Sequence, residues 1–315
     1  MSFFSDVERE LVVRRRVEET PGIVSLTLAA ANGRPLPAWE PGAHIDLVLE
    51  DGLERQYSLS ADPEDRDIWR VAILREDAGR GGSRAAHALA EGAVVRARGP
   101  RSNFAFDAPG SGERAVFVAG GIGITPILPM VRSADRAGAE WTLHYSVRTR
   151  AAVPFAAEIA ALGDRVRLHV SAEGDRADPA AIVAEAGSAP IWACGPDPLL
   201  AALAAAGPAR LHVEPFAVAP AEPERAAEAF EVELMSTGEV IDVPADRSIL
   251  ETLEDRGVFT VSSCREGTCG TCETVVVEGE VDHRDRVLSA AERETSPVMM
   301  ICVSRAACPR LVLDV

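Results

Sequence analysis

Three of the six cysteines, Cys264, Cys269 and Cys272, fall within nine residues, and Gly267 and Gly270 lie between them. Three thiols on so short a loop cannot all pair as disulfides without strain and an odd sulfur left over. Convergence of the thiolates on one metal centre is the chemistry that fits this spacing. Such a centre needs a fourth ligand from elsewhere in the chain.

Cys302 fits the fourth position, because the resulting order C-x4-C-x2-C-x29-C is the spacing of plant-type iron–sulfur sites. Structural zinc is the main alternative, although zinc sites usually take their cysteines as two separated pairs. Three ligands on one loop and one on a distant strand favour a 2Fe–2S cluster, and the loop glycines let the backbone wrap closely around it. Residues 230–315 therefore resemble a plant-type ferredoxin.

A carrier of single electrons needs a source of them, and the first third of the chain holds residues suited to a flavin. They are Arg55, Gln56, Tyr57 and Ser58 in a strand-like run, and Gly81, Gly82 and Ser83 at the start of a helical run. A flavin ring packs against an aromatic face, and its phosphate needs an arginine and the N–H groups of a helix start. Each residue alone has a plainer interpretation, with Tyr57 in a core, Arg55 an exposed charge and the glycines a turn. The combination favours a flavin site.

A second cofactor site is indicated where the strand-like run RAVFVAG leads into a glycine-rich turn. Turns of this kind between a strand and a helix hold the pyrophosphate of nucleotides. The turn contains Gly120, Gly121, Gly123 and Thr125. At Pro126 it departs from the GxGxxG/A pattern. Another strand ends at the same carboxyl edge with Cys194, Gly195 and Pro196. Cys194 alone also fits the role of a small buried hydrophobe.

The elements that must position these residues change in kind along the chain. Short strand-like runs with Gly, Pro and Asp turns predict an antiparallel β-barrel, and alternation of strand and helix predicts a parallel sheet covered on both faces. The predicted domains are a flavin-binding β-barrel at 1–110, a nucleotide-binding α/β domain at 111–216, a linker at 217–229, and a β-grasp-like α+β ferredoxin domain at 230–315. The linker is rich in Ala, Pro and Glu and has little to bury.

The ferredoxin-like tail has two local signals and a strong charge. FEVELMSTGEVIDV predicts a hairpin, and Ser248 and Glu251 fit a capping box at the start of a helix. The tail carries 17 Asp and Glu against 8 Arg, a net charge of −9 out of −17 for the whole chain. This acidity predicts a partner with a basic face docking near the cluster loop, and it disfavours nucleic acid as a partner. The alternative is that the carboxylates only keep the domain soluble.

Neither a membrane span nor an export signal is evident in the sequence. Residues 115–131, the longest mostly apolar run, contain three glycines and two prolines and are short for a span. The start, MSFFSDVERE, is charged at once and lacks an apolar segment. With closely spaced thiols as well, we expect no membrane association, a reducing cytoplasm as the location, and a monomer.

The order of the motifs is RxYS and GGS, then GGIGITP and CGP, then the cysteine loop. Over nearly its whole length, the chain resembles the phthalate dioxygenase reductase and vanillate O-demethylase reductase family. Those proteins are similar to ferredoxin–NADP reductases with a ferredoxin fused behind them. The resemblance implies FMN, a 2Fe–2S cluster and a pyridine nucleotide, with NADH expected and NADPH the alternative.

The resemblance also implies roles for individual residues. Cofactor contacts are implied for Arg55, Gln56, Tyr57, Ser58, Gly81, Gly82 and Ser83 toward FMN, and for Gly120, Gly121, Gly123, Thr125, Arg148, Cys194, Gly195 and Pro196 toward the nucleotide. Arg55 and Ser83 look like ligands of the FMN phosphate. The residues expected at the reacting rings are Tyr57, Ser58, Thr125, Cys194 and Phe216.

Some of these roles have alternatives. Cys194 would face the nicotinamide. Phe216 looks like the aromatic residue that covers the other face of the flavin, with a core or a docking surface as the alternative. Arg148 looks placed for the adenosine half of the nucleotide, and Arg150 lies close enough to hold a 2′-phosphate, which would favour NADPH.

The implied function is an NADH-dependent oxidoreductase that passes electrons through FMN and the 2Fe–2S cluster to a separate Rieske-type oxygenase, in an aromatic-ring dioxygenase or a demethylase system. Two alternatives stay open. One is a reductase of the same build that serves a cytochrome or a free ferredoxin, and the other is a redox sensor without steady turnover. Cys308 and His283 match no ligand role, and we expect a packed thiol and a surface imidazole.

Overall fold

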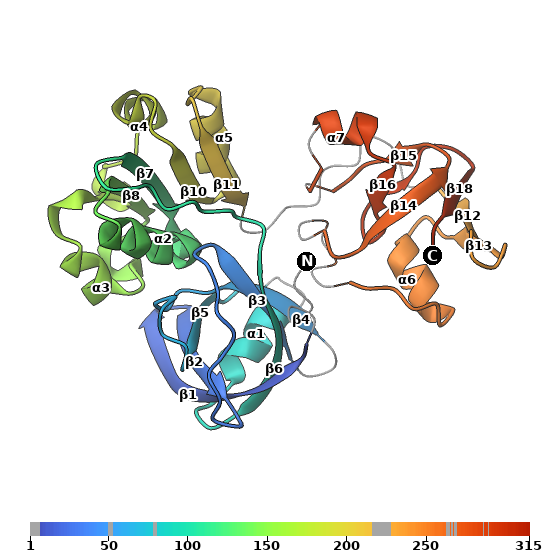
Figure 1. Cartoon of the computed structure of the whole chain (residues 1–315), viewed down its shortest axis with the longest axis horizontal. Helices are drawn as coiled ribbons and strands as arrows, with labels where there is room; N and C mark the ends of the chain where they lie inside the picture. The colour runs from blue at the N-terminus through green and yellow to red at the C-terminus, as the bar shows by residue number, and fades with distance from the viewer. Residues whose placement is uncertain are drawn as a thin grey trace. The chain divides into compact units, whose positions relative to one another are not determined.

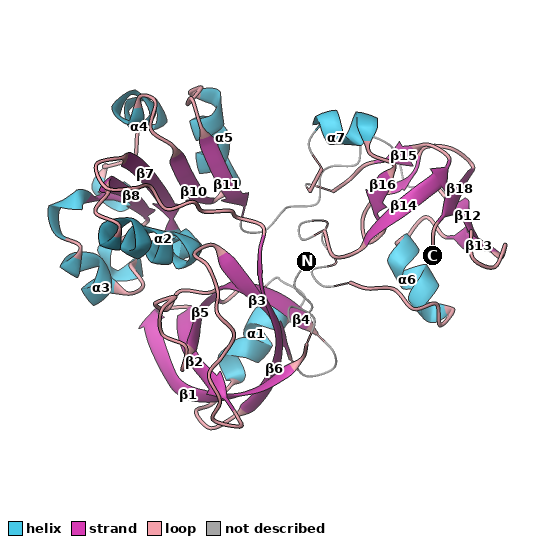
Figure 2. Cartoon of the chain, viewed as in Figure 1, coloured by secondary structure: helices cyan, strands magenta, loops and turns pink. Residues whose placement is uncertain are grey.

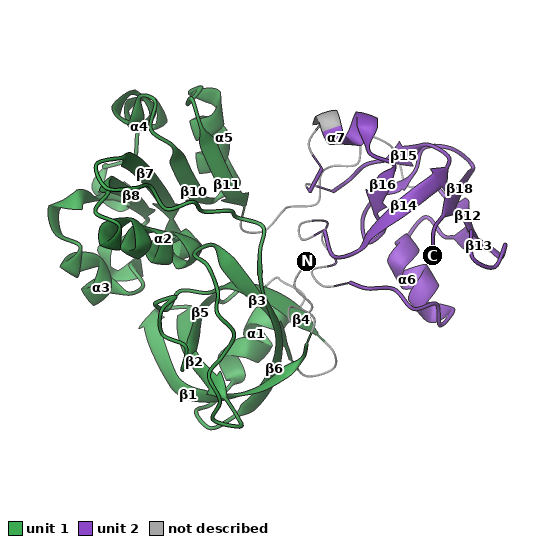
Figure 3. Cartoon of the chain, viewed as in Figure 1, with its two compact units in different colours: residues 1–217 green, residues 218–315 purple. Residues whose placement is uncertain are grey.

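The computed structural model describes residues 7–49, 53–77, 81–215, 228–262, 265, 267, 270–285, 287–288 and 290–315 (Figure 1). The chain divides into two units, residues 1–217 and residues 218–315 (Figure 3). Three predicted site residues, Phe216, Cys264 and Cys269, lie outside the described residues, as does most of the predicted linker.

An antiparallel six-stranded sheet forms the first half of the first unit. Its strands are β1 (Arg9–Thr20), β2 (Ile23–Ala30), β3 (Ala43–Val48), β4 (Glu54–Ser58), β5 (Trp69–Leu74) and β6 (Val94–Ser102), in the order β4-β3-β6-β1-β2-β5. A bridge between Leu59 and Val71 brings the two edges of the sheet together. The helix α1 (Gly82–Ala88) packs beside β4 and β5. The barrel predicted from the short strand-like runs is confirmed.

A parallel five-stranded sheet forms the second half of the same unit. Its strands are β7 (Arg114–Gly120), β8 (Glu140–Val147), β9 (Val166–Val170), β10 (Ile191–Gly195) and β11 (Leu211–Pro215), in the order β11-β10-β7-β8-β9. Helices α2 (Ile124–Arg136) and α3 (Ala156–Ala161) cover one face, and α4 (Pro179–Ala186) and α5 (Asp197–Ala205) cover the other (Figure 2). Short 3-10 turns are η2 (Gly121–Gly123), η3 (Arg150–Ala152), η4 (Gly163–Arg165) and η5 (Ser171–Glu173). The predicted α/β class is confirmed, and all five strands end at one carboxyl edge, where nucleotides bind in such sheets.

The apolar run 115–131 is divided between β7 and α2, where its side chains are buried against other parts of the sheet. Phe117 and Leu128, for example, are fully buried. None of the helices in the described ranges combines the length and the apolar character needed to cross a membrane.

Charged contacts join the barrel to the parallel sheet within the first unit. Arg70 of β5 donates to both carboxylate oxygens of Glu158 in α3, at 2.6 and 3.0 Å, and Arg132 of α2 pairs with the same carboxylate. Arg136 donates to both oxygens of Asp62, at 2.9 and 2.8 Å. Two-pronged arginine contacts fix orientation as well as distance. The barrel and the parallel sheet therefore form one frame.

The second unit is an α+β fold, as predicted. Its strands are β12 (Phe230–Leu234), β13 (Val240–Val243), β14 (Glu273–Glu278), β16 (Val298–Met300) and β18 (Arg310–Leu313), in the order β13-β12-β18-β14-β16, with a separate ladder of β15 (Val281–Asp282) and β17 (Arg305–Ala306). Its helices are α6 (Ile249–Asp255) and α7 (Ala290–Thr295). The predicted hairpin is β12 and β13, with Phe230 opposite Val243. The predicted capping box is also present, because Ser248 Oγ accepts from Glu251 N at 3.1 Å and Glu251 Oε2 accepts from Ser248 N at 3.0 Å.

Candidate functional site

Arg55 lies on β4, and its side chain runs across the start of α1. Gly82, the first residue of that helix, is buried, and a Cβ there would lie 2.5 Å from Arg55 Cγ and 2.7 Å from Arg55 Nε. The first N–H groups of an α-helix have no partner inside the helix. The guanidinium group and these N–H groups therefore lie together and form a cradle suited to a phosphate.

Gly81 and Ser83 belong to the same cradle. Gly81 precedes the helix with φ +91°, in the left-handed region that favours glycine. Ser83 Oγ accepts from Glu76 N at 3.0 Å and donates to Glu76 O at 3.3 Å, which ties the helix start to the segment after β5. The fold thus brings four predicted phosphate-site residues together, and their contact with FMN stays a prediction.

Tyr57 and Gln56 point to opposite sides of β4. Tyr57 lies on the same side as Arg55, because residues two apart in a strand face the same way. Its ring packs against the barrel core, and burial raises the pKa of its hydroxyl. The amide of Gln56 instead donates to Asp46 Oδ1 at 2.9 Å. Tyr57 is therefore placed beside the cradle, whereas Gln56 has a partner within the barrel.

Ser58, at the end of β4, meets the parallel sheet at Glu214. Glu214 lies on β11 in register with Cys194 of β10, and Cys194 Sγ lies 3.8 Å from Glu214 Oε2. The hydroxyl of Ser58 lies near enough to the Glu214 carboxyl group to act on its pKa. These three side chains join the barrel side of the site to the carboxyl edge of the parallel sheet.

Electrostatics at this junction favour protonated groups. Burial raises the pKa of Glu214 to about 8, although hydrogen bonds with Cys194 and Ser58 act in the opposite direction. Burial raises the pKa of Cys194 well above its ordinary value. At neutral pH, Glu214 therefore holds a proton and Cys194 is a thiol. The junction offers a proton-holding carboxyl group and no thiolate nucleophile.

The glycines of the turn after β7 have two different roles. A Cβ at Gly120 would lie 2.6 Å from Pro196 Cδ, and one at Gly195 would lie 3.1 Å from Gly120 N. These two glycines therefore let the ends of neighbouring strands pack closely. A Cβ at Gly121 would meet nothing within 4 Å among the described residues. The backbone there faces open space, where a pyrophosphate can approach it.

Thr125 and Pro126 begin α2 just beyond this turn. Thr125 is 4% exposed, and its hydroxyl donates to Ile122 O at 3.0 Å, so it braces the turn from inside. Gly123, the residue before the helix, is buried. Pro126 is the third helical residue, a position whose N–H has no partner inside a helix in any case. The departure from the glycine pattern is therefore compatible with the turn, and contacts of Thr125 with a nucleotide stay a prediction.

The two arginines predicted near the adenosine half have different surroundings. Arg148 is exposed at the end of β8. Arg150 donates from Nε and Nη2 to the two carboxylate oxygens of Glu173, at 2.9 and 2.8 Å, and this hydrogen bonding raises the pKa of Arg150. Glu173 follows β9 at the same carboxyl edge. An acidic residue therefore already pairs with the guanidinium group that a 2′-phosphate would require.

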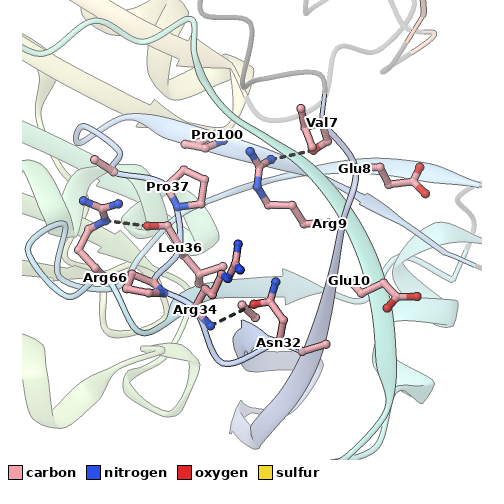
Figure 4. Close-up of a pocket in the computed structure, with 14 residues that line it drawn as sticks. Val7, Glu8, Arg9, Glu10, Asn32, Arg34, Leu36, Pro37, Arg66 and Pro100 are labelled. Atoms are coloured by element: carbon pink, nitrogen blue, oxygen red, sulfur yellow. Dashed lines mark hydrogen bonds between the residues drawn. The ribbon is translucent and has the colours of Figure 1, made fainter.

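A cavity of about 860 Å³ lies elsewhere on the barrel, against the start of β1 and the segment between β2 and β3 (Figure 4). Arg9 donates to Val7 O at 2.7 Å and Arg66 donates to Leu36 O at 2.7 Å, so both guanidinium groups hold the walls. None of the predicted cofactor-binding residues lines this cavity. The flavin site at the cradle of Arg55 stays a prediction that this cavity does not bear on.

Two of the four predicted cluster ligands lie in the described part of the chain. Cys272 and Cys302 are buried, 4% and 7% exposed. Ile301 N donates to Cys272 O at 3.4 Å, beside the pairing of β14 with β16, so the two cysteines come from neighbouring segments. Buried cysteines on neighbouring segments fit the thiolate ligands of an iron–sulfur cluster. For Cys264 and Cys269 the ligand role stays a prediction.

The structure corrects the interpretation of His283. Its side chain is 13% exposed, and its Nδ1 lies 3.4 Å from Asp285 Oδ1, so it is not a surface imidazole. The reason is that the segment after β15 turns inward at Asp285, which is 2% exposed. Cys308 is partly buried, and its Sγ accepts from Glu280 N at 3.2 Å, in agreement with a packed thiol.

Comparison with known proteins identifies relatives over the full length. The 2Fe-2S iron-sulfur cluster binding domain matches residues 232–307. The phenoxybenzoate dioxygenase subunit beta of Ectopseudomonas oleovorans is 44% identical over 286 residues, which cover 89% of this chain and 88% of that protein. The crystal structure of phthalate dioxygenase reductase, described as modular for electron transfer from pyridine nucleotides to a 2Fe–2S centre, is 33% identical with a TM-score of 0.76, and 98% of each chain is covered. The chain belongs to the phthalate dioxygenase reductase family.

The reductase is also similar to part of a longer protein. An intact type IV self-sufficient cytochrome P450 monooxygenase is 39% identical to it with a TM-score of 0.84. The match covers 98% of the reductase and 41% of the P450 chain. The reductase thus spans less than half the length of that protein.

The reductase is an oxidoreductase that uses a flavin, a pyridine nucleotide and a 2Fe–2S cluster. The residues at the cradle fit a flavin phosphate. Because Gly82 has no Cβ, the Arg55 side chain can lie against the start of α1, beside the first N–H groups of that helix. When bound, the flavin supplies the change from two-electron to one-electron chemistry. That the cradle at Arg55 binds the flavin phosphate and that Tyr57 packs against the ring stay predictions.

Two acidic residues of the site, Glu214 and Glu173, were not predicted. Glu214 lies in the run VEPFAV, from which only Phe216 was predicted as a site residue. The feature that could have indicated it is an acidic residue near the end of a strand in a parallel sheet. Glu173 follows a strand that ends beside the segment of Arg148 and Arg150. Their partners are distant in sequence, so spacing alone does not reveal them.

We expect Glu214→Gln to stabilise the first unit relative to the wild type at alkaline pH. In the folded reductase Glu214 loses its proton near pH 8, against an ordinary value of 4.5. Between these values the folded state keeps a proton that the unfolded state releases. Wild-type stability therefore falls as the pH rises from about 4.5 to about 8, whereas glutamine has no proton to lose. The accumulated difference is on the order of a few kcal/mol.

Thermal unfolding of the cofactor-loaded protein, followed by flavin fluorescence, checks this expectation. Between about pH 6 and about pH 9, the melting temperature of the variant minus that of the wild type should rise by roughly 5 °C or more. Glu173→Gln, at an exposed position on the same sheet edge, is the control, and its difference should stay constant. A Glu214→Gln difference that does not change with pH contradicts the raised pKa.

Proposed function

We propose that the reductase carries electrons from NADH through FMN and the 2Fe–2S cluster to a separate Rieske-type oxygenase. The observation that carries the proposal is the meeting of Ser58, Glu214 and Cys194. Hydride transfer needs the nicotinamide against the flavin, and this junction joins the flavin side of one sheet to the nucleotide side of the other. The sequence relatives, one of them named as a dioxygenase subunit, support an oxygenase as the acceptor.

Each residue has a defined task in this proposal. Arg55 and the first N–H groups of α1 bind the FMN phosphate, and Tyr57 packs against the flavin ring. Gly121 lets the pyrophosphate of the nucleotide approach the backbone. Glu214 holds a proton at its carboxyl group, and Cys194 faces the nicotinamide as a neutral thiol. Phe216 covers the opposite face of the flavin in this proposal.

The pairing of Arg150 with Glu173 supports NADH as the nucleotide. A 2′-phosphate would have to compete with Glu173 for the guanidinium group and would meet a like charge beside it. A ribose 2′-hydroxyl meets no such repulsion and can donate to the carboxylate. Arg148 is left for the adenosine half of NADH.

A haem protein is the second candidate acceptor. The fused P450 monooxygenase is similar to the reductase over 98% of the reductase chain, and that similarity favours a cytochrome over a free ferredoxin. The proposal keeps the Rieske oxygenase first because phthalate dioxygenase reductase matches the reductase from end to end, with 98% of each chain covered.

Charge supports docking at the cluster-bearing unit. Residues 230–315 have 17 Asp and Glu against 8 Arg, so an acceptor with a basic face is steered toward this unit at low salt. A monomeric state and a cytoplasmic location are parts of the same proposal, and the closely spaced cysteines of the sequence support a reducing location.

Turnover with different acceptors tests the proposal. We expect NADH to be preferred over NADPH, and a purified Rieske oxygenase component to be reduced faster than a soluble bacterial cytochrome P450. Between roughly 20 and 300 mM salt, transfer to the oxygenase should slow, while reduction of ferricyanide, a small anion, should stay constant or rise. Faster reduction of the P450 would favour the second candidate. An equal response of both activities to salt would show that the acidic unit is not the docking face, and no steady turnover with any acceptor would indicate a sensor.

A further inference from the structure

Asp285 is a buried carboxyl group in the second unit. It is 2% exposed and lies in the segment after β15. Its Oδ2 accepts from Val287 N at 3.1 Å and from Leu288 N at 2.9 Å, and its Oδ1 accepts from Ser304 Oγ at 3.2 Å. A carboxyl group is costly to remove from water unless its oxygens are hydrogen-bonded. The partners of Asp285 indicate what this buried carboxyl group does.

Ser304 connects Asp285 to the segment of the distant cluster ligand. It is fully buried and follows Cys302 by two residues. Its hydroxyl accepts from Arg284 N at 3.1 Å while it donates to Asp285. Both hydrogen bonds of the Ser304 hydroxyl are therefore made with neighbouring residues, Arg284 and Asp285. They hold the chain near Cys302 against that segment.

Gly267 brings the cysteine loop to the same place. It stands between the first and second cysteines of the loop, and a Cβ there would lie 2.5 Å from Val303 Cγ2 and 3.1 Å from Asp285 Cα. Even a methyl group would force one of these neighbours to move. Gly267, which lies between the predicted ligands Cys264 and Cys269 in the sequence, therefore rests on Asp285 and on the residue next to Cys302.

An arginine side chain holds the same segment from another direction. Arg293 donates to the backbone carbonyl of Asp285, and the imidazole of His283 lies beside its carboxyl group, with Nδ1 3.4 Å from Asp285 Oδ1. The backbone and the side chain of Asp285 are therefore both fixed. A fixed carboxyl group between two ligand-bearing segments is suited to setting the distance between them.

We propose that Asp285 is a positioning residue for the 2Fe–2S cluster, which it serves by holding the cysteine loop and the segment of Cys302 at the spacing the cluster requires. The inference rests on the cluster-binding part of the proposed function. Asp285 acts through Ser304 on one side and through backbone contact with Gly267 on the other. Groups that orient the ligands of a metal site affect both metal retention and reduction potential.

Asp285→Asn and Ser304→Ala test this in the full-length protein carrying flavin and cluster. The asparagine keeps the size of the side chain but replaces one acceptor oxygen by a donor, and the alanine removes only the hydroxyl. We expect both variants to retain flavin and to lose iron to a chelator such as bathophenanthroline roughly 10-fold faster or more than the wild type. We also expect shifted EPR g-values of the reduced cluster and a shifted reduction potential. The control is Asp242→Asn, because Asp242 is an exposed carboxylate on β13 of the same unit and takes no part in these contacts, and this variant should match the wild type.

Wild-type g-values, potential and iron-loss rate in both variants would overturn the proposal, whatever happens to their melting temperatures. If Asp285→Asn does not yield folded protein, Ser304→Ala alone decides the question. None of these measurements uses an oxygenase, so a reductase that fails to serve a Rieske oxygenase leaves the test intact. A wild type without iron and sulfide would instead refute the cluster assignment itself.

Discussion

Cys302→Ala is expected to remove most of the visible absorbance of the cluster and to reduce electron transfer to a protein acceptor to background. The buried thiol at this position is the predicted fourth ligand, and three thiolates cannot complete the four-cysteine set of the cluster. Turnover from NADH to ferricyanide should continue, because that small oxidant takes electrons directly from the flavin. Iron and sulfide content, the absorbance spectrum and the two activities are the measurements.

Cys308→Ala is the matched control for Cys302→Ala. Cys308 is a free cysteine of the same unit, and its thiol accepts from Glu280 N and lies 3.0 Å from Arg310 O. This variant should keep both cofactors and both activities. A Cys302→Ala protein with a full complement of iron and sulfide would rule out the ligand assignment.

Arg55→Ala is expected to weaken FMN binding by about 1.5–3 kcal/mol, or roughly 10- to 150-fold in Kd, the scale of a lost charge-assisted hydrogen bond. Gly82→Ala should act in the same direction, because its Cβ would lie 2.5 Å from Arg55 Cγ and displace the side chain. Titration of flavin-free protein with FMN, followed by fluorescence quenching, measures both effects.

Arg96→Ala is the control for the cradle. Arg96 belongs to the same barrel but lies on β6, where it pairs with Glu8 at 2.7 Å. Its affinity for FMN should equal that of the wild type. Flavin retention in Arg55→Ala equal to that of the wild type would refute the phosphate assignment. The cluster content should be unchanged in all three variants, which separates flavin loss from general unfolding.

Local patterns were sufficient to predict most of the architecture. The capping box of Ser248 and Glu251, the β12–β13 hairpin and the turn from β7 into α2 depend on residues close together in sequence, and all three are present. The change from strand-only runs to alternating strands and helices likewise reflects a local hydrophobic period. The fold classes of all three predicted domains could therefore be read from the chain.

The site was less predictable because its contacts join distant segments. Glu214 meets Ser58 from another sheet and Cys194 from a neighbouring strand, and no spacing rule connects these positions. The raised pKa of Glu214 depends on burial that only the assembled unit creates. The prediction for His283 was wrong for the same reason. Its side chain is only 13% exposed because the segment turns inward at Asp285, and the sequence around it is polar and gives no sign of that turn.

The carboxylate of Glu158, shared by Arg70 from the barrel and Arg132 from the nucleotide half, has a consequence for how such genes can be rearranged. A fragment encoding the barrel alone would leave Arg70 without its bidentate partner and Asp62 without Arg136, and it would lack Glu214. The flavin half and the nucleotide half therefore stabilise each other within one compact unit. Residues 218–315 form a unit of their own, so a recombination event that adds, removes or exchanges that unit leaves this frame intact.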